Sequence, residues 1–440
     1  MAISLNELKQ LVTSQKERIP SLYGQVDFSK TPQRFAGGEA DRTQLPRRMA
    51  KKFRGQLLAD KERVERARAY TMLGDTVADA YAALMPQYGF KRLIDMLKQA
   101  CDQGVKSVEN PPQELIDFIG SMENVPAWLD PDLMEEGARI SRNQMANLTP
   151  FAIRGAFIAT FMNKYSGLPM ALTGALSSES AVQRVNETAS FFTTATLPGA
   201  LRRYGVGFKA AAMVRLMHSM VRFNLLTRSE KWNVDVFGIP IPQVDQMPAG
   251  TIPAFLAAFS AMSRKKKRFT REERAIVELC RYQSFLLGLP EELLPATPKE
   301  IVDVMMAYSG TLRDGYDDET CGALVRATMA AYRPKDKSLK SRLYNETEKR
   351  FSKVFFNRVF LSNGNRSLAK KMNVQASPID YLFFGLASAY VLPQVLATKV
   401  AQRIPILDDM VDKILIDKIN RLLVEYGHPE FTTDASNYRQ

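Results

Sequence analysis

The chain has 440 residues, of which 45% are hydrophobic and 24% are charged. This composition is close to the average of folded globular proteins and excludes a disordered, collagen-like or mucin-like chain. Lysine and arginine number 60 against 47 acidic residues, which gives a net charge of +13, and histidine occurs only twice. So few histidines exclude most multi-histidine metal sites, whereas the positive charge leaves binding to nucleic acid or to an anionic surface open.

The cysteines and the N-terminus bear on the cellular compartment. Cys101, Cys280 and Cys321 form no CxxC pair, so we expect buried, reduced thiols and no thiolate metal site. The first residues lack a basic segment followed by an apolar one, so no signal peptide is predicted. A cytoplasmic protein is expected, and peripheral contact with a membrane stays open.

The predicted elements along the chain are helices. Residues 1–55 are basic and expected to be rich in loops, with a basic cluster at 47–54. Helix starts, marked by capping residues or by proline at the first helical position, are predicted at Asp130–Pro131, Thr270–Glu273, Thr297–Glu300 and Asp317–Asp318. Apolar residues recur at three- and four-residue spacing through 351–360, 379–396 and 410–426. Because period-two alternation is missing, the predicted fold class is all-α.

The longest charge-poor stretch lies near the C-terminus. Residues 381–397 are apolar except for a few polar positions, and they fall short of the roughly 20 residues of a spanning helix. We predict a buried core helix, with interfacial membrane contact as the alternative.

One histidine lies on the apolar side of a predicted helix over residues 207–226. His218 shares an apolar stripe with side chains four residues before it and three and seven residues after it. Arg215 and Arg222 project within roughly 60° of it. Desolvation and two cations favour the neutral imidazole, and a lone histidine with two arginines suits haem: one axial ligand, and cations for the propionates. The ordinary alternative is a hydrogen-bonded core histidine beside salt-bridged arginines.

A second polar group lies upstream, in a predicted helix over residues 180–194. Arg184 and Thr188 share one face of this helix, and Glu187 adjoins them. A cation, a carboxylate and a hydroxyl together could bind a polar oxidant and move protons. The alternative is an Arg184–Glu187 surface pair one helical turn apart.

Five segments follow one another in the middle of the chain. They are Leu172-Thr-Gly174, Arg184-Val-Asn-Glu-Thr188, Val214-Arg-Leu-Met-His-Ser-Met-Val-Arg222, Trp232 with Phe237-Gly-Ile-Pro-Ile-Pro-Gln243, and Phe269-Thr-Arg-Glu-Glu273 leading into Leu286-Leu-Gly-Leu-Pro-Glu-Glu-Leu-Leu-Pro295. Together they resemble the rubber oxygenases (latex clearing proteins) and the endoplasmic-reticulum oxygenase of mycophenolic acid biosynthesis. The likeness covers about residues 134–312.

This resemblance implies an all-α, globin-like core that holds haem b. His218 matches the proximal iron ligand, and Arg215 and Arg222 match the arginines that flank it. Arg184 and Thr188 match polar residues on the distal side. The implied organisation is a basic N-terminal segment with a helical extension (1–130), an oxygenase-like haem core (131–330) and a C-terminal helical extension (331–440).

Two positions depart from the rubber-cleaving branch of the family. Glu187 stands where that branch has a lysine, and Phe223 stands where it has a second histidine. A carboxylate cannot mimic a lysine that caps iron, but it can act as a base or orient water. The resemblance therefore implies haem binding by His218 more directly than it implies cleavage of polyisoprene.

The family's reaction is oxidative attack by O2 on a carbon–carbon double bond of an isoprenoid. The expected function is therefore a haem b-dependent oxygenase for an apolar, isoprenoid-like small molecule, with Arg184, Glu187 and Thr188 as catalytic residues. A noncatalytic helical protein that binds lipid or haem is the alternative. A nucleic-acid-binding helical protein is disfavoured because basic and aromatic residues do not alternate, so no nucleic-acid partner is expected.

Ordinary roles are predicted for the two remaining features. The basic run at 264–268 is predicted to be a solvated loop, which together with 47–54 could touch anionic lipid. His428 is expected at the surface, after the last helix.

Overall fold

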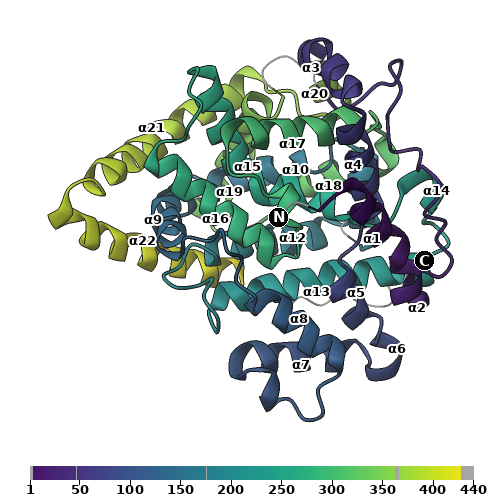
Figure 1. The fold of residues 1–440 in the computed structure, drawn as a ribbon. Coiled ribbons are helices and arrows are strands. Elements are labelled where there is room, and N and C mark those ends of the chain that lie inside the picture. Colours follow the sequence, from purple (N-terminus) through teal and green to yellow (C-terminus); the bar gives the residue numbers. More distant parts are fainter. Residues whose placement is uncertain (1–2, 46, 175, 362–365, 428–440) are drawn as a thin grey trace. The chain divides into compact units, whose positions relative to one another are not determined.

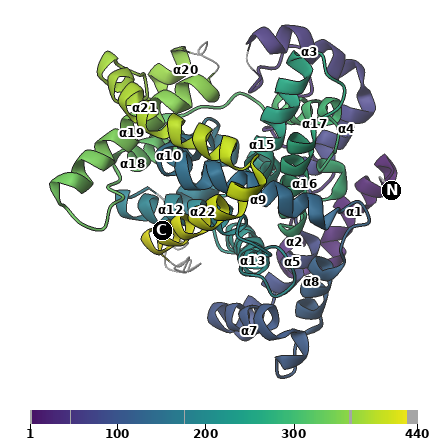
Figure 2. The ribbon, with the colours of Figure 1, turned by 90° about the vertical axis from the view of Figure 1, so that its left-hand side faces the viewer.

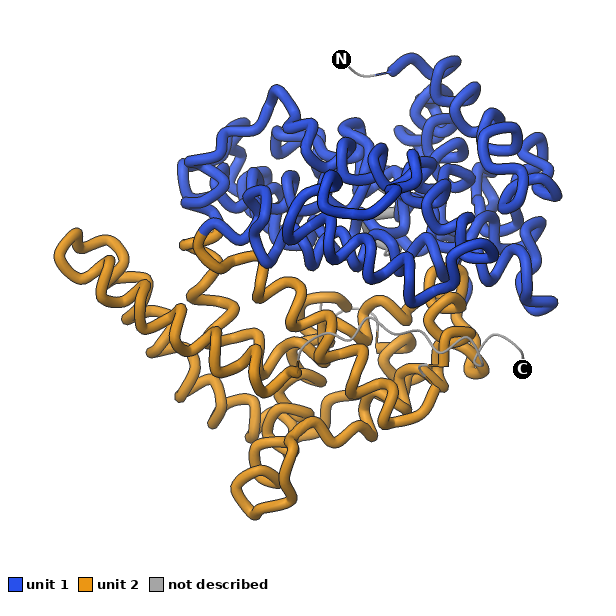
Figure 3. The backbone as a smooth tube through the Cα atoms, turned by 90° about the horizontal axis from the view of Figure 1, so that it is seen from below, with its two compact units in different colours: residues 1–137, 199–315, 431–440 blue, residues 138–198, 316–430 orange. Residues whose placement is uncertain are grey.

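The computed structural model describes residues 3–45, 47–174, 176–361 and 366–427, so His428 lies outside the described residues. Helices make up 71% of the structure, and its described part contains no β-strand, only isolated bridges (Figure 1). The predicted all-α fold class is therefore confirmed. The chain divides into two compact units, which Figure 3 colours separately.

Unit 1 draws its described residues from 1–137 and 199–315. Its helices are α1 (Leu5–Arg18), α2 (Pro20–Tyr23), α3 (Arg47–Ala59), α4 (Lys61–Thr71), α5 (Thr76–Ala82), α6 (Met85–Tyr88), α7 (Phe90–Gln103), α8 (Gln113–Glu123), the start of α9 (Pro131–Asn147), α13 (Val206–Thr227), α14 (Val234–Phe237), α15 (Gln243–Ser263), α16 (Arg271–Leu286) and α17 (Pro298–Thr311), with short 3₁₀ turns at Val105–Ser107 and Glu291–Leu293.

Helix α13 forms the centre of unit 1. It packs against α2, α5, α7 and α16, and 16 of its 22 residues are buried. A neighbouring apolar cluster, which includes Ala258, Val277 and Ile301, joins α15 to α16 and α17. Because α13 is enclosed on nearly all sides, its polar side chains must find partners inside the protein.

Unit 2 draws its described residues from 138–198 and 316–427. Its elements are the end of α9, α10 (Thr149–Ala159), α11 (Lys164–Leu172), α12 (Ser178–Thr194), a π-helical turn (Asp318–Gly322), α18 (Ala323–Ala330), α19 (Leu339–Val359), α20 (Arg366–Lys371), α21 (Pro378–Ala401) and α22 (Pro405–Tyr426).

The core of unit 2 is built around α10 and α19. Figure 2 shows these two helices with α18, beside α21. Gly155 on α10 allows the close approach, because a Cβ atom there would collide with the backbone carbonyl of Ser352 on α19. Ile158, Leu324 and Phe356 are fully buried in the resulting apolar cluster.

Most predicted helix starts are confirmed. Asp130 accepts a hydrogen bond from the first turn of α9, and Thr270 and Glu273 form the capping box of α16. Thr297 caps α17, which has Pro298 in its first turn. Asp317 caps the π-helical turn that leads into α18. The expectation of a loop-rich segment over 1–55 is wrong for residues 47–55, which belong to α3, and for its first part. Ser4 and Glu7 form a capping box there, and the buried Leu8 and Val12 anchor α1.

The prediction of a buried core helix over 381–397 is also wrong. Helix α21 covers this stretch, but only 3 of its 24 residues are buried. It packs on one side, against α19 and α22, so its apolar composition does not enclose it. Among the described residues, α21 is the one helix long and apolar enough to cross a membrane by length and composition.

Candidate functional site

His218 is half-buried on the central helix α13. Its Nδ1 lies 2.8 Å from Oε1 of Gln246 on α15. The side-chain amide of Gln246 donates to Oε1 of Gln243, 3.2 Å away, which turns the Gln246 oxygen toward the ring. With the Gln246 oxygen as acceptor, Nδ1 is assigned the ring proton, and a neutral imidazole then has its lone pair on Nε2. This tautomer, held by a hydrogen bond to a carbonyl oxygen, is the one that suits a metal ligand.

The two glutamines are themselves held in place. Gln243 and Gln246 are nearly fully buried and lie three residues apart in the first turns of α15. The backbone N–H of Gln243 donates to the carbonyl of Leu73, 2.9 Å away. The chain Gln243–Gln246–His218 thus fixes the ring orientation from one side of α13. Sequence reasoning did not single out Gln246; the glutamine spacing on one helix face was the available signal.

Arg215 is ion-paired within unit 1. Its Nε and Nη2 lie 2.5 Å and 2.9 Å from the two carboxylate oxygens of Asp75, and its Nη1 donates to the Ser121 hydroxyl at 2.9 Å. Asp75 also caps α5. Gly288 sits against this pair with a φ of 87°, and a Cβ atom there would collide with both Asp75 and Arg215. The glycine of the segment 286–295 is thus explained by packing and by backbone conformation.

Arg222 is fully buried and forms an ion pair with Asp79. It also donates to the carbonyl oxygens of Pro240, at 2.9 Å, and Ile241, at 2.5 Å. The Tyr23 hydroxyl donates to Asp79 at 2.6 Å, and burial raises the pKa of Tyr23 so that it stays protonated. Every side of this guanidinium is therefore occupied by protein.

The structure gives the histidine and the arginines different neighbours. His218 faces α15, whereas Arg215 and Arg222 pair with the carboxylates of Asp75 and Asp79 at α5. Both arginines belong to a buried network that holds α13 against α5. Their expected pairing with haem propionates stays a prediction.

The second predicted group lies on α12, in unit 2. Nη1 of Arg184 is 3.1 Å from Oε2 of Glu187, and the Gln183 amide donates to Oε1 of Glu187 at 2.8 Å. The Thr188 hydroxyl donates to the carbonyl of Arg184, 2.8 Å away. Burial raises the pKa of the Glu187 carboxyl, although Arg184 acts in the opposite direction. The three residues therefore form one partly buried cluster, and not a fully solvated surface pair.

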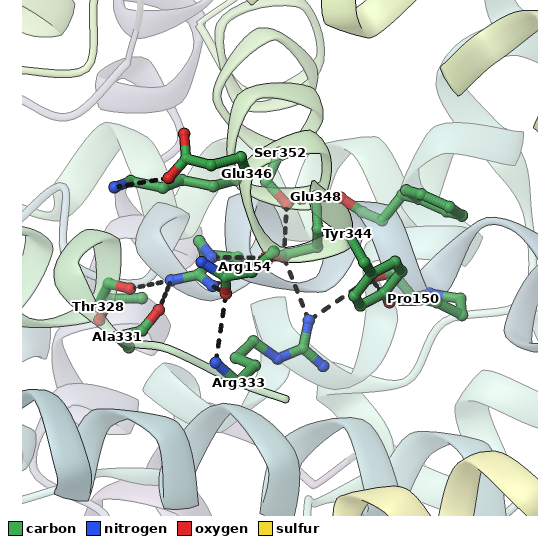
Figure 4. A network of polar contacts seen from close by, with 12 residues as sticks. Pro150, Arg154, Thr328, Ala331, Arg333, Tyr344, Glu346, Glu348 and Ser352 are labelled. Atoms are coloured by element: carbon green, nitrogen blue, oxygen red, sulfur yellow. Dashed lines mark hydrogen bonds and ion pairs between the residues drawn. The ribbon is translucent and has the colours of Figure 1, made fainter. Parts of the chain in front are cut away.

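A buried charge network, shown in Figure 4, anchors the helices around this cluster. Arg154 is fully buried; it donates to Glu348 at 2.9 Å and to the carbonyl oxygens of Thr328 and Ala331. Arg333 contacts the other carboxylate oxygen of Glu348 at 3.2 Å, and its Nε donates to Asn186 on α12 at 3.3 Å. Asn186 directly precedes Glu187, so the network fixes the segment that carries the carboxyl.

The family follows from comparison with known proteins. Residues 142–399 match the family described as ER-bound oxygenase mpaB/B'/rubber oxygenase, catalytic domain. The chain belongs to this family. The match includes both α12 and α13, so it contains all six predicted site residues. The resemblance drawn from the sequence is confirmed, and the chain is a member of an oxygenase family.

A solved structure supports the fold of this mpaB/rubber-oxygenase family member. It is entitled "Structure of Latex Clearing Protein LCP in the closed state" and is 18% identical, with a TM-score of 0.54 over 81% of this chain and 91% of that chain. The curated proteins give no match. At this identity the likeness concerns the fold.

Two of the sequence segments that carry the resemblance meet α13. The segment 237–243 supplies the carbonyl oxygens around Arg222, and Gly288 of the segment 286–295 lies against the Asp75–Arg215 pair.

The described residues contain no cluster of three or more histidine, cysteine or carboxylate side chains placed to hold a metal ion. A metal bound to this part of the chain would therefore have fewer than three such side chains as ligands.

Proposed function

We propose that this family member is a haem b-dependent oxygenase that uses O2 to attack a carbon–carbon double bond of an apolar, isoprenoid-like substrate. The observation that carries the proposal is the hydrogen bond between Nδ1 of His218 and Oε1 of Gln246. It leaves the lone pair of the ring on Nε2, and a single imidazole of this tautomer is the donor that a b-type haem requires.

The residues of unit 1 fit such a group. His218 would hold the iron through Nε2, and Gln246 would keep the ring in one tautomer and one orientation. The buried pairs Arg215–Asp75 and Arg222–Asp79 keep the helix that carries His218 in place. Haem, when bound, would supply the binding and activation of dioxygen, which no amino-acid side chain provides.

The residues of unit 2 are proposed to handle protons. A Glu187 carboxyl with a raised pKa keeps its proton to higher pH than an exposed glutamate, a shift that favours a role in donating a proton and taking it back. Arg184 keeps the carboxylate form accessible because it is paired with it, and the Thr188 hydroxyl is proposed to orient a bound oxidant. These three residues are proposed as catalytic residues.

The substrate class comes from the family. The words "rubber oxygenase" in the family's description name an unsaturated isoprenoid polymer. Because Glu187 replaces the lysine of the rubber-cleaving branch, we propose a smaller unsaturated isoprenoid as the substrate of this chain.

An absorption spectrum tests haem ligation. The full chain, reconstituted with haem b, is expected to show a Soret band that His218→Ala abolishes. The matched control is His428→Ala, which changes the only other histidine and should leave the band unchanged. A chain without a Soret band after reconstitution, or a band lost in His428→Ala and kept in His218→Ala, would contradict the proposal.

A haem titration tests the role of Gln246. Gln246→Ala removes the acceptor for the Nδ1 proton, so haem should bind about 10- to 100-fold more weakly, with a shifted Soret maximum. Gln246→Glu retains an acceptor and should restore much of the affinity. Unchanged affinity in Gln246→Ala would show that the hydrogen bond has no part in ligation.

Oxygen consumption separates the oxygenase from a noncatalytic relative. The haem-loaded chain should consume O2 when an unsaturated terpenoid is added, and the saturated analogue should give no response. A chain that binds haem but consumes no O2 with a broad panel of unsaturated terpenoids would instead be a noncatalytic haem- or lipid-binding protein.

A further inference from the structure

Helix α21 turns an uninterrupted apolar face outward. This face consists of Leu382, Leu386, Ala389, Pro393, Leu396 and Val400, which follow one another at helical spacing and are all exposed. The side chains of Leu386 and Leu396 are 62% and 61% exposed. A helix at the surface of a soluble protein normally turns polar residues outward, so an exposed apolar face of this length indicates a contact surface.

The apolar surface continues into the start of α22. The two helices form a V whose apex projects from the rest of unit 2 (Figure 1). Ile404, Ile406 and Met410 lie at this apex, and Ile406 is 89% exposed. The apolar face of α21 and the apex thus form one surface, which we call the C-terminal apolar surface.

The opposite side of α21 is fixed to unit 2. Phe384 stacks on Phe351 of α19 with ring centroids 4.7 Å apart, and the Asn143 amide donates to the carbonyl of Val395 at 2.9 Å. With 24 residues the helix is about 36 Å long, enough to cross a bilayer. Spanning would break these contacts, so the geometry favours a helix that lies along a surface.

The exposed charges that flank the apolar stretch in sequence are mostly positive. No charged residue occurs from 381 to 398. The exposed basic residues on either side in sequence are Arg366, Lys370 and Lys371 before the helix and Lys399, Arg403 and Lys413 after the apolar stretch. Of the nearby acidic residues, Asp408 and Asp412 pair with arginines of α9, and Asp409 is exposed. An apolar face flanked by cations matches a leaflet of anionic lipid.

We infer that the C-terminal apolar surface binds the face of an anionic lipid bilayer, with α21 lying in the plane of the membrane. The leucines enter the boundary between headgroups and acyl chains, and the flanking lysines and arginines contact the headgroups. This inference does not depend on haem or on the proposed reaction, and it gives an enzyme for apolar substrates access to the phase in which such substrates dissolve.

Charge complementarity favours lipid over a second copy of the chain. Two copies that meet symmetrically through this surface would bring identical basic borders toward each other, because both copies use the same patch. Like charges oppose that contact, whereas an anionic bilayer attracts all of them at once.

Vesicle flotation with the full chain tests the inference. The chain should float with vesicles of phosphatidylcholine mixed with phosphatidylserine and bind pure phosphatidylcholine more weakly. Leu386→Asp combined with Leu396→Asp should lower the partition coefficient at least tenfold on the mixed vesicles, because burying one leucine is by itself worth about that factor. Lys399→Glu with Arg403→Glu should weaken binding to the mixed vesicles and leave binding to pure phosphatidylcholine unchanged.

Matched controls keep the result specific. Val125→Asp changes a valine that is 55% exposed in a loop of unit 1. Lys265→Glu combined with Lys266→Glu changes two lysines of the exposed run at 264–268. Neither control should alter the floated fraction by more than about twofold. Circular dichroism confirms that each variant is folded. The inference is overturned if folded Leu386→Asp, Leu396→Asp protein floats like the parent, or if the run at 264–268 alone carries binding. It is equally overturned if the parent protein binds neither kind of vesicle. This holds whether the parent is a monomer or a dimer that the two aspartate substitutions dissociate.

Discussion

Helices α13 and α21 have similar lengths, 22 and 24 residues, and both are rich in apolar residues; a buried core helix is the prediction for the stretch 381–397 of α21. In the structure 16 residues of α13 are buried, against 3 of α21. Helix α13 contains two arginines and a histidine and lies at the centre of unit 1. Helix α21, with no charge along 18 consecutive positions from 381 to 398, carries its apolar residues at the surface. Apolar content alone therefore does not determine which helix is enclosed.

The difference lies in the partners that each helix finds. Asp75, Asp79 and Gln246 come from distant parts of the chain and pair with Arg215, Arg222 and His218 of α13, so these three side chains can be enclosed. Helix α21 has neighbours on one side only. Four sets of variants test this difference.

The largest effect is expected where a partner inside unit 1 is removed. Asp79→Ala leaves the fully buried Arg222 without its carboxylate, so the free energy of unfolding should fall by about 3–5 kcal/mol, measured by urea denaturation. Asp409→Ala, which removes an exposed partner of Arg139 in unit 2, is the control and should cost about 1 kcal/mol or less. A cost below about 1 kcal/mol for Asp79→Ala would show that the pair does not hold α13 in place.

Leucine truncation compares the two helices directly. Leu216→Ala on α13 removes a fully buried side chain and should lower the free energy of unfolding by about 2–5 kcal/mol. Leu386→Ala on α21 removes one that is 62% exposed and should change it by about 0.5 kcal/mol or less. Equal costs in the same denaturation assay would mean that the face of α21 is covered in solution.

Local signals in the sequence predicted much of the fold. The caps at Thr270 and Thr297 and the helix around His218 were predicted correctly, because a helix start depends on residues a few positions apart. The capping box of Ser4 and Glu7 is an equally local signal, which the basic composition of residues 1–55 does not reveal.

The partners of the site residues could not be predicted from local signals. Asp75 lies 140 positions from Arg215, and Gln246 lies 28 positions from His218. Such pairs depend on how helices pack, which a periodic pattern does not encode. The exposure of α21 depends in the same way on which neighbours are present, so its apolar residues were assigned to the core.

A smaller effect is expected from the pH dependence of Glu187, the carboxyl on α12 that pairs with Arg184. Burial raises its pKa above the ordinary value of about 4.5, so the folded state binds this proton more tightly than the unfolded state. Stability therefore loses this contribution as the pH rises from the unfolded pKa through the raised folded pKa. Glu187→Gln should flatten that decline in thermal unfolding measured across pH, whereas Glu179→Gln, fully exposed on the same helix, should leave the decline as it is. An unchanged slope in Glu187→Gln would place the carboxyl in solvent.

The smallest perturbation uses thiol reactivity as a probe of the two helices. Burial raises the pKa of Cys101, Cys280 and Cys321 to about 12, so the folded chain should react negligibly with a thiol-specific disulfide reagent at mildly alkaline pH. Leu386→Cys adds a thiol on the exposed face of α21 and should add one fast-reacting group, whereas Leu216→Cys on α13 should add none until denaturant is present. Anionic vesicles should slow the reaction at position 386, because a thiol among acyl chains is removed from an aqueous reagent. Fast reaction of the thiol at position 216, or slow reaction at position 386 without lipid, would contradict the difference in exposure between the two helices. The reaction rate depends only on whether the reagent reaches the thiol, so the result does not depend on the function of either helix.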